Sequence, residues 1–413
     1  MYNPNYGYFP KEAVIFTPKE PFDFQSLPDI DAFERQFREQ YATFEDELDE
    51  KKKNDTRQLW HTPTELFQPH YAIAMARYMA TNYKLSLYPY HDLLIYEIGA
   101  GNGTFMINVL DYLQADFPEV YERTKFKIIE ISSNLADKQK KNLRDTAHDS
   151  GHIDKVEVIN QSIFDWDTYV SSPCFFVALE VFDNFAHDSI RYDARSLTAY
   201  QTWVVIDRNG ELREYYESGL DPVALRFLRI RDEATSKSFP HPLTTRDPFW
   251  RYWHRIAPGH GQAATLTLPE YIPTRLMQFF DILHNYFPAH RLLSSDFTGF
   301  DTSVPGINAP AVQTRYKRQM IDVTTPLVSI PSFQSDTSLL TLVQVMQGYF
   351  VVLFPTNFGV MEDIYQAMTG KLSRVLSHEE FLRRWAYTGD TETRSGENPL
   401  LSYYKNAAML VTL

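Results

Sequence analysis

Short, continuous apolar runs alternate with segments of helical periodicity along much of the chain. The first run covers residues 93–96, and apolar side chains then recur at helical spacing over 104–113. Further strands are predicted at 125–132, 155–159 and 174–179, and the last of these is again apolar throughout. Strands that are apolar throughout are typical of a parallel sheet buried on both faces. The pattern therefore predicts an α/β fold, a mostly parallel sheet with helices on both faces.

The sequence before the first apolar run predicts two helices. Apolar side chains recur on one face of residues 29–54, whose other positions are mostly charged, so we expect an amphipathic helix there. A second helix is expected to begin after Thr62, an N-cap residue, because a proline follows it and Glu65 lies three positions later. We expect an N-terminal arm and helix over 1–57 and one larger domain over 58–413.

The second half of the chain contains further predicted elements. Residues 200–206 and 212–216 alternate as the strands of a hairpin around an Asn-Gly turn. Helical periodicity over much of 220–285 predicts a helical subdomain inserted into the sheet domain. The remaining expected elements are strands at 291–297, 348–355 and 407–412 and helices at 339–346, 359–369 and 377–385.

A glycine-rich turn directly follows the first predicted strand. Its sequence, EIGAGNGT, contains Gly99, Gly101 and Gly103. A strand, a glycine turn and a helix in this order let the backbone approach a ligand closely, while the helix N-terminus offers free N–H groups. A glycine triplet alone can be only a tight turn. With Ala100 and Thr104, these glycines are the predicted cofactor contacts.

Two acidic residues indicate which cofactor this turn would bind. Glu97 comes just before the glycines, where its charge would repel a pyrophosphate but attract a ligand carrying an ammonium and a sulfonium. Glu130, at the end of the second predicted strand, lies where a carboxylate can accept both hydroxyls of a ribose. Together they favour S-adenosyl-L-methionine. An NAD-type site shares the second acid and is the nearest alternative.

Polar residues follow the third predicted strand, whose carboxyl end should meet the ligand edge of the sheet. Gln161 and Ser162 could bond the edge of an adenine there, and Ile163 could cover one of its faces. Any strand end that faces solvent would also carry polar residues, so the pattern alone leaves both interpretations open.

The fourth predicted strand ends in the sequence EVFDN, which supplies the candidate catalytic residues Glu180, Asp183 and Asn184. Their carboxylates would join Glu97 and Glu130 at one edge of the sheet. Acids gathered in this way repel one another unless a cation is bound. A sulfonium cofactor and a guanidinium or ammonium substrate would meet that requirement.

Composition and charge narrow the class of partner. The 413-residue chain carries 40 Lys and Arg against 53 Asp and Glu, a formal charge of −13. Such a chain disfavours general nucleic-acid binding and suits a cationic protein substrate. Its one cysteine, Cys174, excludes a disulfide framework or a cysteine metal site, and we expect no metal centre. No apolar segment is long enough to span a membrane, and the first residues show no secretory or mitochondrial presequence.

Four motifs in order resemble those of a known family. They are NPNYGYF at 3–9, TPTELFQ at 62–68, EIGAGNGT at 97–104 and EVFDN at 180–184. They are similar to NPxxGYY, TSPEISQ, ELGPGRGT and EFFDxLPV of the MidA-like mitochondrial protein arginine methyltransferases, the complex I assembly family. The chain resembles a divergent, fungal-looking branch of it.

The resemblance implies a Rossmann-like class I methyltransferase that uses S-adenosyl-L-methionine. It further implies a mitochondrial location and an arginine acceptor on a protein, in the family a complex I subunit. Two departures fall where the substrate is expected: FAH at 185–187 replaces the family's LPV, and SDFT at 295–298 stands for its IDYG. A non-catalytic assembly factor that keeps the fold, and a methyltransferase acting on a small molecule or RNA, therefore remain alternatives.

Overall fold

A mostly parallel sheet forms the centre of the computed structural model, which describes residues 13–51, 58–194, 196, 198–206, 212–236, 266–316, 318–323 and 350–413. Within these residues the sheet has seven strands in the order β15-β16-β11-β6-β3-β4-β5. All neighbours pair in parallel except β16, which runs antiparallel to both β11 and β15. The strands are β3 Leu93–Ile98, β4 Thr124–Ile129, β5 Val156–Ile159, β6 Cys174–Leu179, β11 His290–Phe297, β15 Ser373–Ser377 and β16 Ala407–Thr412.

The central strand β6 shows why its sequence is apolar at every position. All six of its residues are buried. Phe175 and Val177 belong to the hydrophobic core on one face of the sheet, and Phe176 and Ala178 to the core on the other. Because successive side chains of a strand point to opposite faces, a strand covered on both sides has no polar position. The predicted α/β fold is thereby confirmed.

Helices cover both faces of the sheet. The first core includes side chains of α4 His70–Ser86, α5 Thr104–Asp116, α7 Ser133–Ser150 and α12 His378–Trp385. The second includes side chains of α8 Pro222–Ala234, α10 Thr274–Tyr286 and α11 Phe358–Thr369. Short helices α6 Pro118–Tyr121 and α13 Pro399–Ser402 also contribute to the first core. In the described part of the chain, no helix is both long and apolar enough to cross a membrane.

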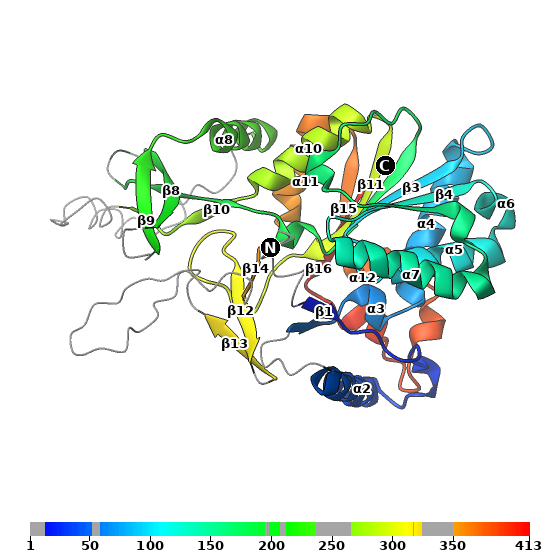
Figure 1. Cartoon of the computed structure of the whole chain (residues 1–413). Coiled ribbons are helices and arrows are strands. Elements are labelled where there is room, and N and C mark those ends of the chain that lie inside the picture. Colours follow the sequence, from blue (N-terminus) through cyan, green and yellow to red (C-terminus); the bar gives the residue numbers. More distant parts are fainter. Residues whose placement is uncertain are drawn as a thin grey trace.

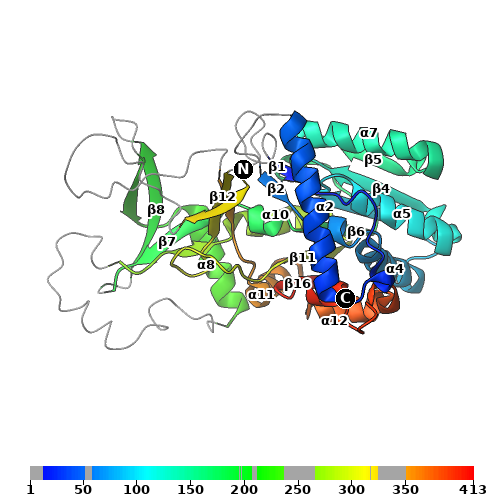
Figure 2. The ribbon, with the colours of Figure 1, turned by 90° about the horizontal axis from the view of Figure 1, so that it is seen from below.

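The N-terminal arm packs against the sheet domain. Strand β1 Ala13–Ile15 pairs in parallel with β2 Gln58–Trp60, and α2 Ile30–Lys51 lies along the domain (Figure 2). In α2, Phe33 stacks on Phe67 with ring centroids 5.7 Å apart. The helix expected after Thr62 is divided into α3 Pro63–Leu66 and α4, which begins after Pro69. The motif at 3–9 lies outside the described residues.

Two antiparallel sheets are attached to the central domain. In the described residues one has the order β10-β7-β8-β9 and the other β13-β12-β14. The four-stranded sheet and α8 lie on the far side of the molecule from α5 and α6 (Figure 1). The strands are β7 Asp188–Tyr192, β8 Ala199–Ile206, β9 Leu212–Ser218, β10 Glu270–Ile272, β12 Ala311–Tyr316, β13 Gln319–Val323 and β14 Val351–Leu353.

The region 220–285 differs from the helical subdomain that its sequence predicts. The hairpin before it is confirmed as β8 and β9, but residues 270–272 pair with β7 as a strand, and α10 begins only after Pro273. Proline has no N–H to donate within a helix. Phe279 of α10 packs on Phe176 of the central sheet, with ring centroids 5.6 Å apart. Residues 237–265, and the helix predicted at 339–346, lie outside the described residues.

Candidate active site

A cavity of about 400 Å³ lies at the carboxyl ends of β3, β4 and β6. Its lining comes from the whole described chain, from Ile15 of β1 to Asn406 just before β16. The residues predicted from strand ends that line it are Glu97, Gly99, Ala100, Gly101, Glu130, Glu180, Asp183 and Asn184. The structure thus brings together most of the residues expected to hold a cofactor and its acceptor.

The glycine turn is tightly packed from two sides. Gly99 and Gly101 have backbone φ angles of 69° and 52°, which residues other than glycine rarely adopt. A Cβ at Gly99 would lie 2.9 Å from Cγ2 of Val181, and one at Gly101 would lie 2.9 Å from Cδ1 of Ile15. The turn therefore depends on glycine for both its backbone conformation and its contacts.

Glu97 and Glu130 are both buried and both line the cavity. Glu97 is 3% exposed, and in the described structure its Oε2 has no hydrogen-bond partner. Burial, with the charge of Glu130, raises the pKa of Glu97 to about 8. Glu130 accepts from the backbone N–H of Ser132 at 2.8 Å and from Nε2 of Gln139 at 3.1 Å, while burial raises its pKa. A bound cation would favour the ionised form of both groups.

The candidate catalytic residues lie on a short turn after β6. Glu180 has a φ of 55°, an uncommon backbone conformation for a residue that is not glycine. Nδ2 of Asn184 donates to Oδ1 of Asp183 at 2.5 Å, which orients that carboxylate. Burial and then neighbouring carboxylates raise the pKa of both Glu180 and Asp183 well above the ordinary range. The turn thus presents two acids whose charges are uncompensated within the site.

Asp296, at the end of β11, holds this turn in place through hydrogen bonds to its backbone. Its Oδ2 accepts the backbone N–H groups of Phe182 at 2.7 Å and Asp183 at 3.1 Å, and its Oδ1 accepts that of Phe297 at 2.7 Å. Burial raises the pKa of Asp296 to about 7. The carboxylate acts as a positioning group for the turn. The sequence showed only a strand ending in an acid.

Glu65 also faces the cavity, a role that sequence reasoning missed because the residue was interpreted as half of a helix cap. Thr62 does cap α3, accepting the N–H of Glu65 at 3.2 Å. The Glu65 carboxylate, however, points toward the glycine turn. There its Oε1 accepts hydrogen bonds from Nδ2 of Asn102 at 3.0 Å and from Oγ1 of Thr104 at 2.8 Å. Thr104 therefore supports the site without lining the cavity.

Other predicted cofactor residues lie beyond the cavity lining. Gly103 is the N-cap of α5, with a φ of 82°. Ser162 caps a short 3-10 helix by accepting the N–H of Phe164, and Ile163 is buried in the second core. Gln161 follows β5 and is half-buried. Their role toward an adenine stays a prediction.

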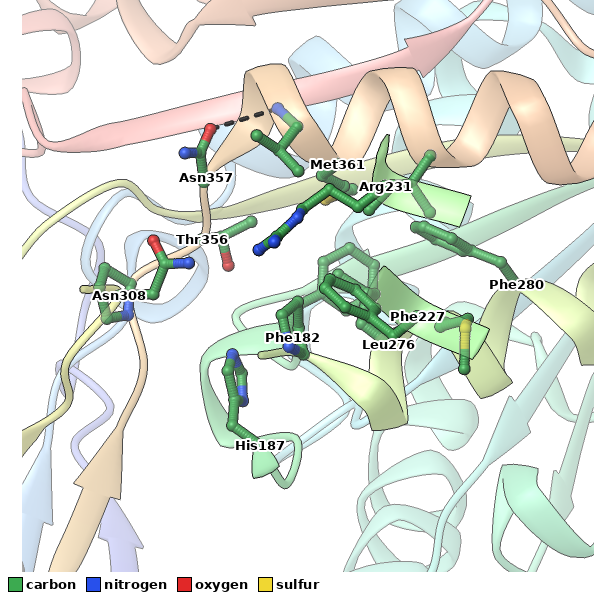
Figure 3. Close-up of a pocket in the computed structure, with 15 residues that line it drawn as sticks. Phe182, His187, Phe227, Arg231, Leu276, Phe280, Asn308, Thr356, Asn357 and Met361 are labelled. Atoms are coloured by element: carbon green, nitrogen blue, oxygen red, sulfur yellow. Dashed lines mark hydrogen bonds between the residues drawn. The ribbon is translucent and has the colours of Figure 1, made fainter. Parts of the chain in front are cut away.

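Of the two departures from the family pattern, residues 185–187 do not line the cavity, contrary to what we expected, whereas Phe297 of the segment 295–298 does. Phe185 is buried against Phe182, and the ring of His187 stacks on that of Phe354 with centroids 3.9 Å apart. Figure 3 shows Phe182 and His187 facing a separate small cavity, toward which Arg231 also points. Its volume of about 30 Å³ suits a water molecule. The substituted residues Phe185 and His187 pack against Phe182 and Phe354, and the acids that line the large cavity are unchanged.

Acidic side chains outnumber basic ones in the lining of the large cavity. Among the described residues that line it there are five carboxylates, from Glu65, Glu97, Glu130, Glu180 and Asp183, and no Lys or Arg. His61 adds no charge near neutral pH, because burial lowers its pKa to about 4. No cluster of acids and histidines in the described chain has the arrangement of a metal site. The cavity is therefore suited to organic cations.

Aromatic and apolar side chains form the remaining wall of the cavity. These are Trp60, Phe297, Phe300, Leu353, Tyr403 and Tyr404. The hydroxyl of Tyr404 lies 2.7 Å from Nδ1 of His61, so the two side chains fix one another. Flat apolar surfaces beside a group of acids can hold the planar face and the charge of a cation at the same time.

Comparison with known proteins identifies relatives over most of the chain. Residues 74–374 match the model of a family described as "Putative S-adenosyl-L-methionine-dependent methyltransferase". A Schizosaccharomyces pombe protein is 28% identical over 325 residues, which cover 76% of this chain and 64% of the relative. A Saccharomyces cerevisiae protein is 22% identical over 354 residues, which cover 83% and 78%. Both are named "Protein arginine methyltransferase NDUFAF7 homolog, mitochondrial". The match spans less than two thirds of the S. pombe protein.

Solved structures share the fold. A Burkholderia thailandensis protein bound to S-adenosyl-homocysteine aligns over 86% of this chain and 79% of its own, with a TM-score of 0.53 and 14% identity. A second crystal structure from the same organism aligns over 84% and 79%, with a TM-score of 0.52 and 14% identity. At this identity the likeness concerns the arrangement of helices and strands.

Proposed function

The chain belongs to the family of S-adenosyl-L-methionine-dependent methyltransferases, and on that premise we propose that it binds this cofactor in the acidic cavity and methylates an arginine of a protein. The observation that carries the proposal is the gathering of five carboxylates, without a lining Lys or Arg among the described residues, around a glycine turn. The names of both yeast relatives support arginine as the acceptor.

The described residues fit this cofactor. The turn at Gly99 lets the backbone approach closely, and Oε2 of Glu97 is a buried acceptor that lacks a partner in the described structure. Glu130 has further acceptor capacity for the hydroxyls of a ribose. Once bound, S-adenosyl-L-methionine supplies an electrophilic methyl group on a positively charged sulfur. A dinucleotide fits less well, because its pyrophosphate would meet the Glu97 carboxylate.

The turn after β6 is suited to an arginine acceptor. A guanidinium pairs with carboxylates through parallel hydrogen bonds. Glu180 and Asp183 supply two carboxylates for this pairing. Asn184 and Asp296 fix the orientation of Asp183, and correct orientation alone can supply much of a rate enhancement. The proton that leaves the substituted nitrogen passes to the carboxylate of Glu180 or Asp183.

Location and partner are proposed from the relatives and the motifs. Both yeast relatives are named as mitochondrial, and the resemblance of the four motifs implies a complex I subunit as the methylated protein. We place the chain in mitochondria on this basis. The acidic cavity and the chain's charge of −13 agree with a cationic protein segment as substrate.

Two measurements test the proposed function. Calorimetric titration should show micromolar binding of S-adenosyl-L-methionine and none of NADH; binding of NADH alone would refute the cofactor. Mass spectrometry of arginine-containing mitochondrial proteins incubated with enzyme and cofactor should then show a gain of one or two methyl groups on arginine.

The variant Asp183→Asn should separate binding from transfer. We expect a loss of transfer of at least about 100-fold with cofactor affinity changed less than about threefold, because Asp183 faces the acceptor. Asp167→Asn, an exposed acid outside the cavity, is the matched control and should keep full activity. Cofactor binding without transfer in the unaltered protein would instead favour a non-catalytic assembly factor.

A further inference from the structure

Among the described acids that line the cavity, Glu65 alone neither belongs to a strand of the central sheet nor lies on a turn that follows one. It lies on α3, in the segment that precedes β3, and it is 3% exposed. Its Oε1 is fully engaged by Asn102 and Thr104, whereas its buried Oε2 has no hydrogen-bond partner in the described structure. A buried carboxylate oxygen without a donor is costly, so a donor is expected to occupy the cavity beside it.

The surroundings of Glu65 place this oxygen at a defined end of the cavity. Its Oε1 bonds to residues of the turn after β3, and its charge raises the pKa of Glu180, which follows β6. The sheet order β4-β3-β6 puts Glu130, which follows β4, on the other side of β3. A cofactor whose ribose is held at Glu130 therefore extends its amino-acid half past the glycine turn toward Glu65.

The glycine turn holds the Glu65 side chain rigidly. Asn102, which donates to Glu65, is itself fixed by Nζ of Lys138 at 2.5 Å and by Nδ2 of Asn142 at 3.0 Å. Burial raises the pKa of Glu65, and this outweighs the opposite effects of the Thr104 and Thr17 hydroxyls, the Asn102 amide and the charge of Lys138, so a further cation in the cavity would favour the ionised form. An ammonium carries three donors and suits a single acceptor atom, whereas a planar guanidinium is matched by a pair of oxygens.

We propose that Oε2 of Glu65 accepts a hydrogen bond from the α-ammonium of S-adenosyl-L-methionine, so that α3 recognises the amino-acid half of the cofactor. This inference rests on the proposed function. It gives the TPTELFQ segment a role in ligand recognition in addition to starting a helix.

The test compares two ligands that differ in the amino-acid half. S-adenosylhomocysteine carries the α-ammonium, and 5′-methylthioadenosine has the same nucleoside and thioether without it. In calorimetric titrations at pH 7, Glu65→Gln should weaken the binding of S-adenosylhomocysteine by about 10- to 100-fold. This is the loss of affinity expected for a charge-assisted hydrogen bond. The affinity for 5′-methylthioadenosine should change less than about threefold, since that ligand does not reach Glu65. Glu20→Gln, an exposed acid, is the control and should change neither affinity.

Binding of 5′-methylthioadenosine also reports that the variant is folded. If Glu65→Gln does not fold, Glu65→Asp takes its place: it keeps the charge but withdraws the oxygen, so the preference for S-adenosylhomocysteine should still fall. An equal loss of affinity for both ligands, or no loss of affinity for either, would overturn the role of Glu65. Unchanged ligand affinities with weaker binding of an arginine peptide would overturn it too, by assigning Glu65 to the acceptor. If the unaltered protein binds neither ligand, the proposed function itself fails.

Discussion

The protonation of Glu97 should make cofactor affinity strongly dependent on pH. Burial and the charge of Glu130 raise its pKa to about 8, so below that pH the ligand-free site holds a proton on this carboxyl. A cationic ligand favours the ionised form, and binding must then release the proton. Affinity is therefore expected to rise with pH, and to level off as the pH passes through 8.

The magnitude follows from the pKa. If the complex requires ionised Glu97, the apparent dissociation constant carries a factor of 1 + 10^(pKa − pH), which is about 100 at pH 6 and about 11 at pH 7. S-adenosyl-L-methionine, which carries a sulfonium and a net positive charge, should thus bind about ninefold more tightly at pH 7 than at pH 6 from this group alone. Other cavity acids with raised pKa values, Glu65, Glu130, Glu180 and Asp183, would add to the slope in the same direction.

The variant Glu97→Gln isolates this contribution. Its plot of log Kd against pH between 6 and 7 should be less steep by about one, and calorimetry in buffers of different ionisation enthalpy should show about one proton fewer released. Glu20→Gln should keep the slope of the unaltered protein, because that residue is exposed and does not line the cavity. Identical slopes for Glu97→Gln and the unaltered protein would refute the reasoning.

Two further predictions concern how the site is held. Gly99→Ala forces a Cβ into a contact of 2.9 Å at a φ of 69°, and should lower the free energy of unfolding by about 1–2 kcal/mol and weaken S-adenosylhomocysteine binding. Gly389→Ala, where no described atom lies within 4 Å of the new Cβ, should be neutral in denaturant titrations of both variants. Asp296→Asn replaces one of the two oxygens that accept buried N–H groups by an NH2 donor and should cost about 2 kcal/mol, with a larger loss in transfer than in cofactor affinity. The exposed control Asp322→Asn should change neither, and an Asp296 variant as active as that control would contradict the positioning role.

The sheet and the strand-end acids could be predicted because they depend on local pattern. Predicted strands of four to eight residues, two of them apolar throughout, identified the central strands, and acids at their ends had to reach one edge because parallel strands share a direction. Glu97, Glu130 and Glu180 therefore line the cavity as expected. The family suggested by four motifs is also confirmed by the family model and the two yeast relatives.

Residues that reach the site through tertiary packing could not be predicted in this way. Glu65 has the spacing of a capping residue, and only the closeness of α3 to the glycine turn shows that its carboxylate bonds to Asn102 and Thr104. Tyr404 lies in the last part of the chain, where nothing in the local sequence links it to His61. The substituted residues Phe185 and His187 directly follow the turn after β6, but Phe185 is buried against Phe182 and the half-buried ring of His187 stacks on Phe354.

The way the cavity is assembled affects the order of events during synthesis. Ile15 of β1 and Asn406 before β16 both contribute to its wall, and β16 must insert between β11 and β15. A nascent chain on the ribosome has its glycine turn and first four parallel strands long before it has this wall. The complete cavity therefore exists only after the residues before β16 have emerged, and a ligand that needs the whole wall can stabilise only chains that have reached that point. Chains terminated before β16 lack this protection and are more exposed to proteolysis.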